Sequence, residues 1–164
     1  MANSFIVGDA KNKIIKEFIK DEAIIKGINP VGIGLHNSEK LINKYIFNFS
    51  QNPNTVHDVE TFITVETNIN NRHFGNNRYV DSTIEIWIIS HEKHMVVDNI
   101  PKVTENRNDY LSRLIDNKLN GSRNIGIGKL ELTSNVEGAI QQNWLYRRLI
   151  FEVVDVNNSF CKDR

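Results

Sequence analysis

The sequence predicts an α+β fold, with a largely antiparallel sheet flanked by two main helices in the order α-β-β-β-α-β-β. Two segments carry apolar residues at the spacing of an amphipathic helix. Runs of alternating and β-branched residues lie between them and after the second one. No Pro-, Gly- or Ser-rich linker divides the 164 residues, so we expect a single domain over the whole chain.

The N-terminal part of the chain is predicted to form one helix over about residues 9–27. Asp9 can accept hydrogen bonds from the free backbone N–H groups of a first turn, which makes it the expected N-cap. Gly27 suits the left-handed position after a last turn, and Pro30 forbids continuation. Between these ends the apolar residues fall largely on one stripe: Ile14, Ile15, Phe18, Ile19, Ile24 and Ile25.

The sheet is expected over about residues 43–98. Residues 31–35 could form a short strand or an extended lead-in, and aromatic residues at every second position from 45 to 49 predict a strand that ends at Ser50. The β-branched run at 61–69 predicts the next strand. A polar loop at 70–78 follows it.

Residues 79–90 give the clearest strand pattern in the chain. Alternate positions from 84 to 88 are isoleucine, while Trp87 and Ile89 lie on the other face. Because most of both faces is apolar, we expect a central strand covered on each side, with the N-terminal helix as one cover. A short strand around 95–97 ends this block.

The second helix is predicted over about residues 108–120, after a polar loop at 101–108. Its apolar residues recur at helical spacing, and Gly121 follows where a left-handed cap is needed. The apolar stripe consists of Tyr110, Leu111, Leu114, Ile115 and Leu119.

A C-terminal hairpin is expected over about residues 128–156. Its strands would run over 128–134 and 144–156, with the Asn-Val-Glu-Gly-Ala sequence at 135–139 as the turn. The polar tail at 157–164 is expected to fray.

Composition and charge exclude several classes of function. Twenty Lys and Arg balance twenty Asp and Glu, which argues against a broadly basic, specific nucleic-acid binder. Cys161 is the single cysteine, so the chain has no internal disulfide framework and no cysteine-based zinc site. No apolar run reaches the roughly 18–20 residues of a membrane span.

The His91-Glu92-Lys93-His94 sequence resembles a metalloprotease motif only superficially. That motif places two histidines at i and i+4 on a helix, so that both imidazoles reach one metal ion. Here the spacing is i and i+3 at the end of a predicted strand, where the side chains diverge. We therefore interpret it as a polar turn.

Acidic residues nearby define an alternative function, a small metal-dependent nuclease that uses Asp81, Glu85 or Glu92 with Lys93 close by. However, Asp81 and Glu85 would lie about 13 Å apart along one strand, too far to chelate one ion.

Other catalytic patterns are incomplete. The glycines at 121–126 have the spacing of a phosphate loop, but Ile127 and Gly128 stand where Lys and Ser or Thr are needed. The chain has no G-x-S-x-G sequence, and Cys161 lies in the polar tail. We therefore expect no cofactor and no enzymatic activity.

Aromatic and arginine residues without an evident core role predict protein contacts instead, because both types are enriched in interfaces. A solvated sheet face with extended arginine side chains is the competing interpretation. The candidate interface residues are Arg72, His73, Phe74, Arg78, Trp144, Tyr146, Arg147 and Arg148.

The order of elements resembles that of the tail-terminator and neck proteins of tailed bacteriophages. The likeness is carried by the runs at 79–89, 110–116, 129–135 and 146–155, and it covers roughly residues 79–156. Proteins of this group have no catalytic residues, and they assemble as rings that close the tail tube or join it to the portal.

The resemblance implies a tail-terminator-like fold and a virion structural protein, assembled in the host cytoplasm. The implied partners are copies of the chain in a hexameric or dodecameric ring, and other virion proteins such as portal, connector or tail tube. No membrane and no specific nucleic acid is expected as a partner. Two alternatives remain, the nuclease and a cellular adaptor that binds one protein through a sheet edge.

Overall fold

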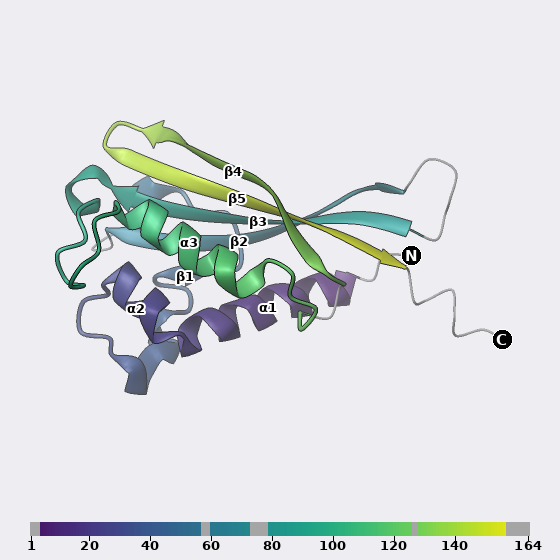
Figure 1. Ribbon diagram of the computed structural model, residues 1–164, viewed down its shortest axis with the longest axis horizontal. Helices are drawn as coiled ribbons and strands as arrows, with labels where there is room; N and C mark the ends of the chain where they lie inside the picture. The colour runs from purple at the N-terminus through teal and green to yellow at the C-terminus, as the bar shows by residue number, and fades with distance from the viewer. Residues whose placement is uncertain (1–3, 57–59, 73–78, 126–127, 157–164) are drawn as a thin grey trace.

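A five-stranded sheet forms the centre of the computed structural model, which describes residues 4–56, 60–72, 79–125 and 128–156 (Figure 1). The strand order is β1-β2-β3-β5-β4; β1 and β2 are parallel, and the other pairs are antiparallel. The strands are Ile46–Phe47 (β1), Thr61–Arg72 (β2), Tyr79–His91 (β3), Leu130–Gln141 (β4) and Trp144–Val156 (β5). The predicted α+β class and the central place of β3 are therefore confirmed.

Three α-helices gather on one side of this sheet (Figure 1): α1 Ser4–Lys20, α2 Glu22–Ile28 and α3 Arg107–Leu119. α1 packs on β2, and α3 packs on β3 and β5. A cluster of buried apolar side chains joins the helices to the sheet. β3 is thus covered by helices on one side only, whereas its sequence predicted a cover on each side.

The N-terminal helix is two helices rather than one, and the break lies at Asp21. The Asp21 carboxylate accepts hydrogen bonds from the backbone N–H groups of Ala23 (3.0 Å) and Ile24 (3.2 Å) and so starts α2. Asp9 is not the N-cap, because α1 already begins at Ser4; Asp9 instead pairs with Lys13 at 2.7 Å, one turn further on.

Gly27 lies inside α2 and does not occupy the left-handed position expected of it. Asn29 takes that position with φ 55°. A Cβ atom at residue 27 would lie 2.6 Å from the Cδ2 atom of Leu111, so glycine is needed here because α2 and α3 cross at close range.

The segment from 31 to 50 contains little strand. A 3-10 helix, Leu35–Leu41, follows the expected lead-in, and the predicted strand ending at Ser50 is reduced to the two residues of β1. Another short 3-10 helix, Pro53–Thr55, precedes β2.

The predicted short strand at 95–97 is wrong. A 3-10 turn, Glu92–His94, ends β3, and the carbonyl oxygens of the following segment face the guanidinium of Arg107 instead of a neighbouring strand. The predicted second helix is confirmed to within one residue at each end, and Gly121 has the expected left-handed backbone, with φ 80°.

The hairpin turn lies further along the chain than the sequence predicted. β4 runs through residues 135–139, and the turn is formed by Gln142 and Asn143, where Asn143 has φ 70°. Two register irregularities in β4, at 132–134 and 139–141, interrupt its alternation and conceal the strand. The predicted tail at 157–164 lies outside the described residues.

Candidate functional site

The side of the sheet away from the helices carries a mixed aromatic and charged surface, which we call the open face. Side chains alternate along a strand, so every second residue of β2, β3 and β5 points to this side. Cross-strand partners arrange them in five rows: Asn68–Thr83–Glu152–Glu131, Glu66–Glu85–Ile150–Ser134, Thr64–Trp87–Arg148–Val136, Phe62–Ile89–Tyr146–Gly138 and His91–Trp144–Gln141.

Trp87 forms the centre of the open face. Its ring lies 4.9 Å from that of Tyr146, and the Arg148 guanidinium lies 5.1 Å from its centroid. Arg148 Nε is also 3.8 Å from Glu85 Oε2, and Asn68 donates a hydrogen bond of 3.0 Å to the other oxygen of that carboxylate. The cation–π contact and the ion pair therefore hold the Arg148 guanidinium over the tryptophan ring.

Further aromatic rings fix one end of this surface. Phe62 packs edge-on against Phe47, with centroids 5.8 Å apart, and against Trp144 at 5.9 Å. The ring of His91 lies 5.3 Å from Trp144. Phe62 is fully buried in this arrangement, so Trp144 and His91 form the accessible part of the aromatic end.

A hollow of about 590 Å³ lies on the open face, beside Trp87 and Tyr146. Residues 50–53 border it on one side, and Ile140 and Gln141 at the end of β4 border it on the other. Apolar rings lie next to amide, hydroxyl and carboxylate groups in this hollow, so it suits a side chain of a protein partner.

Residues 12–153 match the YomW family model, and this range contains every row of the open face. The chain belongs to the YomW family. The family name is of the type given to Bacillus prophage proteins and indicates a phage-associated protein. None of the curated proteins compared with the chain matches it. In the described part of this YomW chain, no helix is long and apolar enough to cross a membrane.

The predicted interface residues on β5 lie on both sides of the sheet. Trp144, Tyr146 and Arg148 belong to the open face. Arg147 points to the helices, where it pairs with Asp109 of α3 and donates a hydrogen bond of 3.1 Å to Asn135. Arg147 therefore holds α3 against the sheet.

The other predicted interface residues cannot be placed on this surface. Arg72 is the last residue of β2, and its side chain lies outside the described residues, as do His73, Phe74 and Arg78 altogether. Sequence reasoning did not select Trp87 as an interface residue. The available signal was a tryptophan between two isoleucines of a central strand, on the side that the helices leave open.

His91 and His94 of the YomW chain have different partners, as the i, i+3 spacing predicted. His91 Nδ1 accepts a hydrogen bond from the Lys93 backbone N–H at 3.2 Å, and its ring contacts Trp144. His94 Nδ1 is 2.7 Å from the Thr61 hydroxyl oxygen. The two rings do not point to a common centre.

The acidic residues of the nuclease alternative are likewise not brought together. Glu85 is engaged with Asn68 and Arg148, Glu92 is exposed in the turn after β3, and the side chain of Asp81 lies outside the described residues. Within the described ranges, no group of three or more His, Cys, Asp or Glu side chains could hold a metal ion.

Proposed function

We propose that this YomW-family chain is a non-enzymatic structural protein of a phage particle. Copies of it form a ring at the head–tail junction, as a neck or tail-terminator component. The open face carries this proposal, because Trp87, Tyr146 and Arg148 lie beside a hollow on the side of the sheet away from the three α-helices. Tryptophan, tyrosine and arginine are the residues that most often dominate the energy of protein interfaces.

A ring would also cover Trp87, Tyr146 and Arg148, which are half-buried in the isolated chain. Ring subunits make heterologous contacts, in which one surface meets a different surface of the next copy until the rotation closes. In the proposed function the ring is a hexamer or dodecamer, and its partners are the portal, a connector or the tail tube.

The proposal is tested on phage particles produced by a host that carries the gene. Quantitative mass spectrometry of purified particles is expected to find the chain in a fixed ratio to the portal protein. Deletion of the gene is expected to yield heads and tails that do not join, visible by negative-stain microscopy. Normal particles after deletion, with no copy of the chain in wild-type particles, would overturn the proposal.

An adaptor that binds one cellular protein is the second candidate, and the edge of the sheet favours it. β4 is an outermost strand of 12 residues, and most of its side chains are exposed. The backbone groups of such an edge can pair with an extended peptide. A pull-down that returns one host protein, without phage proteins, would support the adaptor over the ring.

A further inference from the structure

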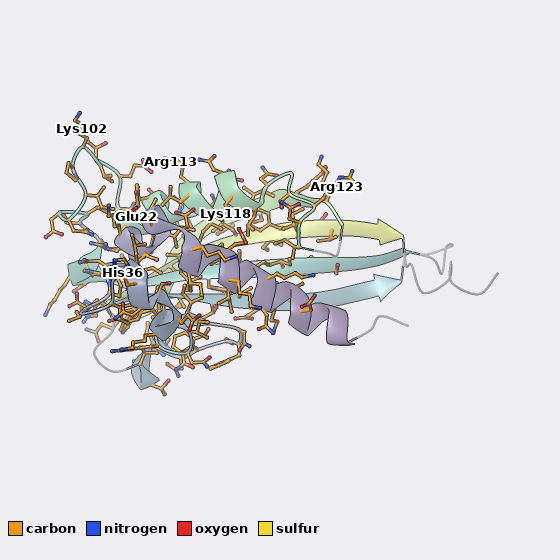
Figure 2. The ribbon with its side chains drawn as sticks, turned by 90° about the horizontal axis from the view of Figure 1, so that it is seen from below. Glu22, His36, Lys102, Arg113, Lys118 and Arg123 are labelled. Carbon is orange, nitrogen blue, oxygen red and sulfur yellow. The ribbon has the colours of Figure 1, made fainter. Side chains whose placement is uncertain are left out.

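A groove on the helical side of the molecule gathers four lysines. Lys13, Lys16 and Lys20 lie at i, i+3 and i+7 on α1, and Lys118 comes from the last turn of α3. The groove has a volume of about 320 Å³, and Figure 2 shows Lys118 beside α1 on this side. We call these four residues the lysine groove.

The carboxylates around the lysine groove leave a positive excess. Four lysines line the groove, whereas three carboxylates lie in or beside it: Glu17 in the lining, and Asp9 and Asp21 as partners of Lys13 and Lys118. Three of the groove lysines have an acidic neighbour: Lys13 with Asp9, Lys20 with Glu17, and Lys118 with Asp21. Lys16 takes part in no ion pair within the described residues, and Arg123 is exposed nearby in sequence, between two residues that line the groove.

Two adjacent rows of the open face carry four glutamates. Glu66 lies directly across from Glu85, and Glu131 directly across from Glu152, in two adjacent rows. Like charges at directly opposed positions destabilise a sheet. Arg148 pairs with Glu85 at 3.8 Å, and Lys129 pairs with Glu131 at 2.7 Å, so two of the four glutamates have a cationic neighbour among the described residues. We call the four glutamates the glutamate rows, and a cationic partner would relieve their repulsion.

The two surfaces lie on opposite sides of the molecule. Lys13 and Lys20 are about 10 Å apart along the α1 axis, at 1.5 Å per residue. Glu66 and Glu131 are three strand spacings and one row apart, about 16 Å. Such an arrangement cannot pair within one molecule, but it can pair between successive copies.

We infer that the lysine groove of one copy binds the glutamate rows of the next, in a head-to-tail contact. This contact rests on the proposed function, since it is the joint from which the ring would be built. The formal net charge of zero fits it, because each copy carries both halves of the pair. Charge complementarity of this kind fixes the orientation and register of an interface.

Charge reversal with complementation tests the contact. One variant carries Lys16→Glu and Lys20→Glu, and the other carries Glu131→Lys and Glu152→Lys; all four side chains are exposed. Each variant alone is expected to self-associate at least about tenfold more weakly than wild type in sedimentation velocity. An equimolar mixture is expected to restore assembly, because every contact then joins opposite charges.

Three controls keep the outcome interpretable. A matched variant, Lys40→Glu with Lys93→Glu, changes two exposed lysines outside the groove and is expected to assemble as wild type does. The neutral pair Lys16→Gln and Lys20→Gln is expected to have an intermediate effect. Circular dichroism melting shows that each variant is folded.

The outcomes separate this inference from the proposed function. If both charge-reversed variants assemble as the wild type does, the contact is overturned and the ring proposal stands. The same holds if each variant is weakened but their mixture fails to assemble. Loss of binding to a DNA duplex by Lys16→Glu/Lys20→Glu, with assembly unchanged, overturns it in favour of a phosphate-binding groove. A monomeric wild-type chain at every concentration overturns both.

Discussion

Arg107 is a fully buried cation that binds backbone oxygens. It donates hydrogen bonds to the carbonyl oxygens of Gly27 (2.6 Å), His94 (2.6 Å) and Val96 (2.9 Å). Burial lowers the pKa of Arg107 from its usual value, and the charges of nearby carboxylates oppose this effect. One side chain therefore joins α2, the segment after β3 and the start of α3.

Replacement of Arg107 by Met is expected to lower the free energy of unfolding by about 3 kcal/mol, because three carbonyl groups lose their donor, and the Gly27 carbonyl loses it at a buried position. Urea unfolding followed by circular dichroism measures this loss. The control is Arg113→Met, also on α3, whose exposed pair with Glu105 is expected to contribute less than about 1 kcal/mol. Equal losses for the two variants would contradict the role of Arg107.

His94 is expected to make the stability of the chain depend on pH. Burial, and then the charge of Arg107, lower the pKa of His94 below its ordinary value of 6.5. The unfolded chain therefore binds a proton at this residue more readily than the folded chain. The free energy of unfolding should fall as pH decreases below about 6.5, toward the lowered pKa.

The measurement is the melting temperature of wild type, His94→Gln and His36→Gln between about pH 7.5 and about pH 5. His94→Gln is expected to weaken the dependence on pH in this range, while His36→Gln, at an exposed position, retains it. Parallel curves for wild type and His94→Gln would contradict the assignment.

At the scale of elements, the crossing of α2 and α3 depends on Gly27. Gly27→Ala should gain helix propensity but place a Cβ atom 2.6 Å from Leu111. We expect a net loss of about 1–3 kcal/mol. Gly8→Ala is the matched control, since a Cβ atom at that helical glycine meets nothing within 4 Å; it should be neutral or stabilising by up to about 1 kcal/mol.

A double variant checks the physical reason for this loss. Leu111→Ala removes the obstructing side chain and creates a cavity, with a loss of its own. If the close approach is the cause, Gly27→Ala should cost less in the Leu111→Ala background than in wild type, as a double-mutant cycle measures. Additive losses would show that the cause lies elsewhere.

Sequence patterns predicted a secondary-structure element correctly where adjacent residues determine that element. The start of β3 and the left-handed Gly121 depend on adjacent residues, and both were predicted correctly. The turn at 135–139 was wrong because β4 is an edge strand whose exposed residues resemble turn residues, and its irregularities disturb the period of two. The break at Asp21 was missed because both helices continue one apolar stripe.

The candidate site required information that the sequence does not hold. The aromatic and arginine residues at 144–148 indicated a contact-forming segment. Strand register, however, decides which side chains each of them meets. Because side chains alternate along a strand, Arg147 and Arg148 point to opposite sides of the sheet. The lysine groove was missed for a similar reason. Its members come from α1 and α3, about a hundred residues apart in sequence, and only packing brings them together.

At the scale of the whole molecule, both tryptophans lie on the open face, and this provides a probe of assembly. If copies cover the open face, dilution should shift tryptophan emission to longer wavelength and increase quenching by acrylamide. Trp144→Phe isolates the signal of Trp87. Emission that does not change between assembled and dissociated samples would show that the contact lies on another surface.

In the proposed function the chain works by binding copies of itself into a closed ring. Native mass spectrometry of the purified chain, over a wide concentration range and at about 0.1 M ionic strength, tests it most directly. We expect a discrete complex of six or twelve copies that does not grow further as concentration increases. A monomer at every concentration would contradict it.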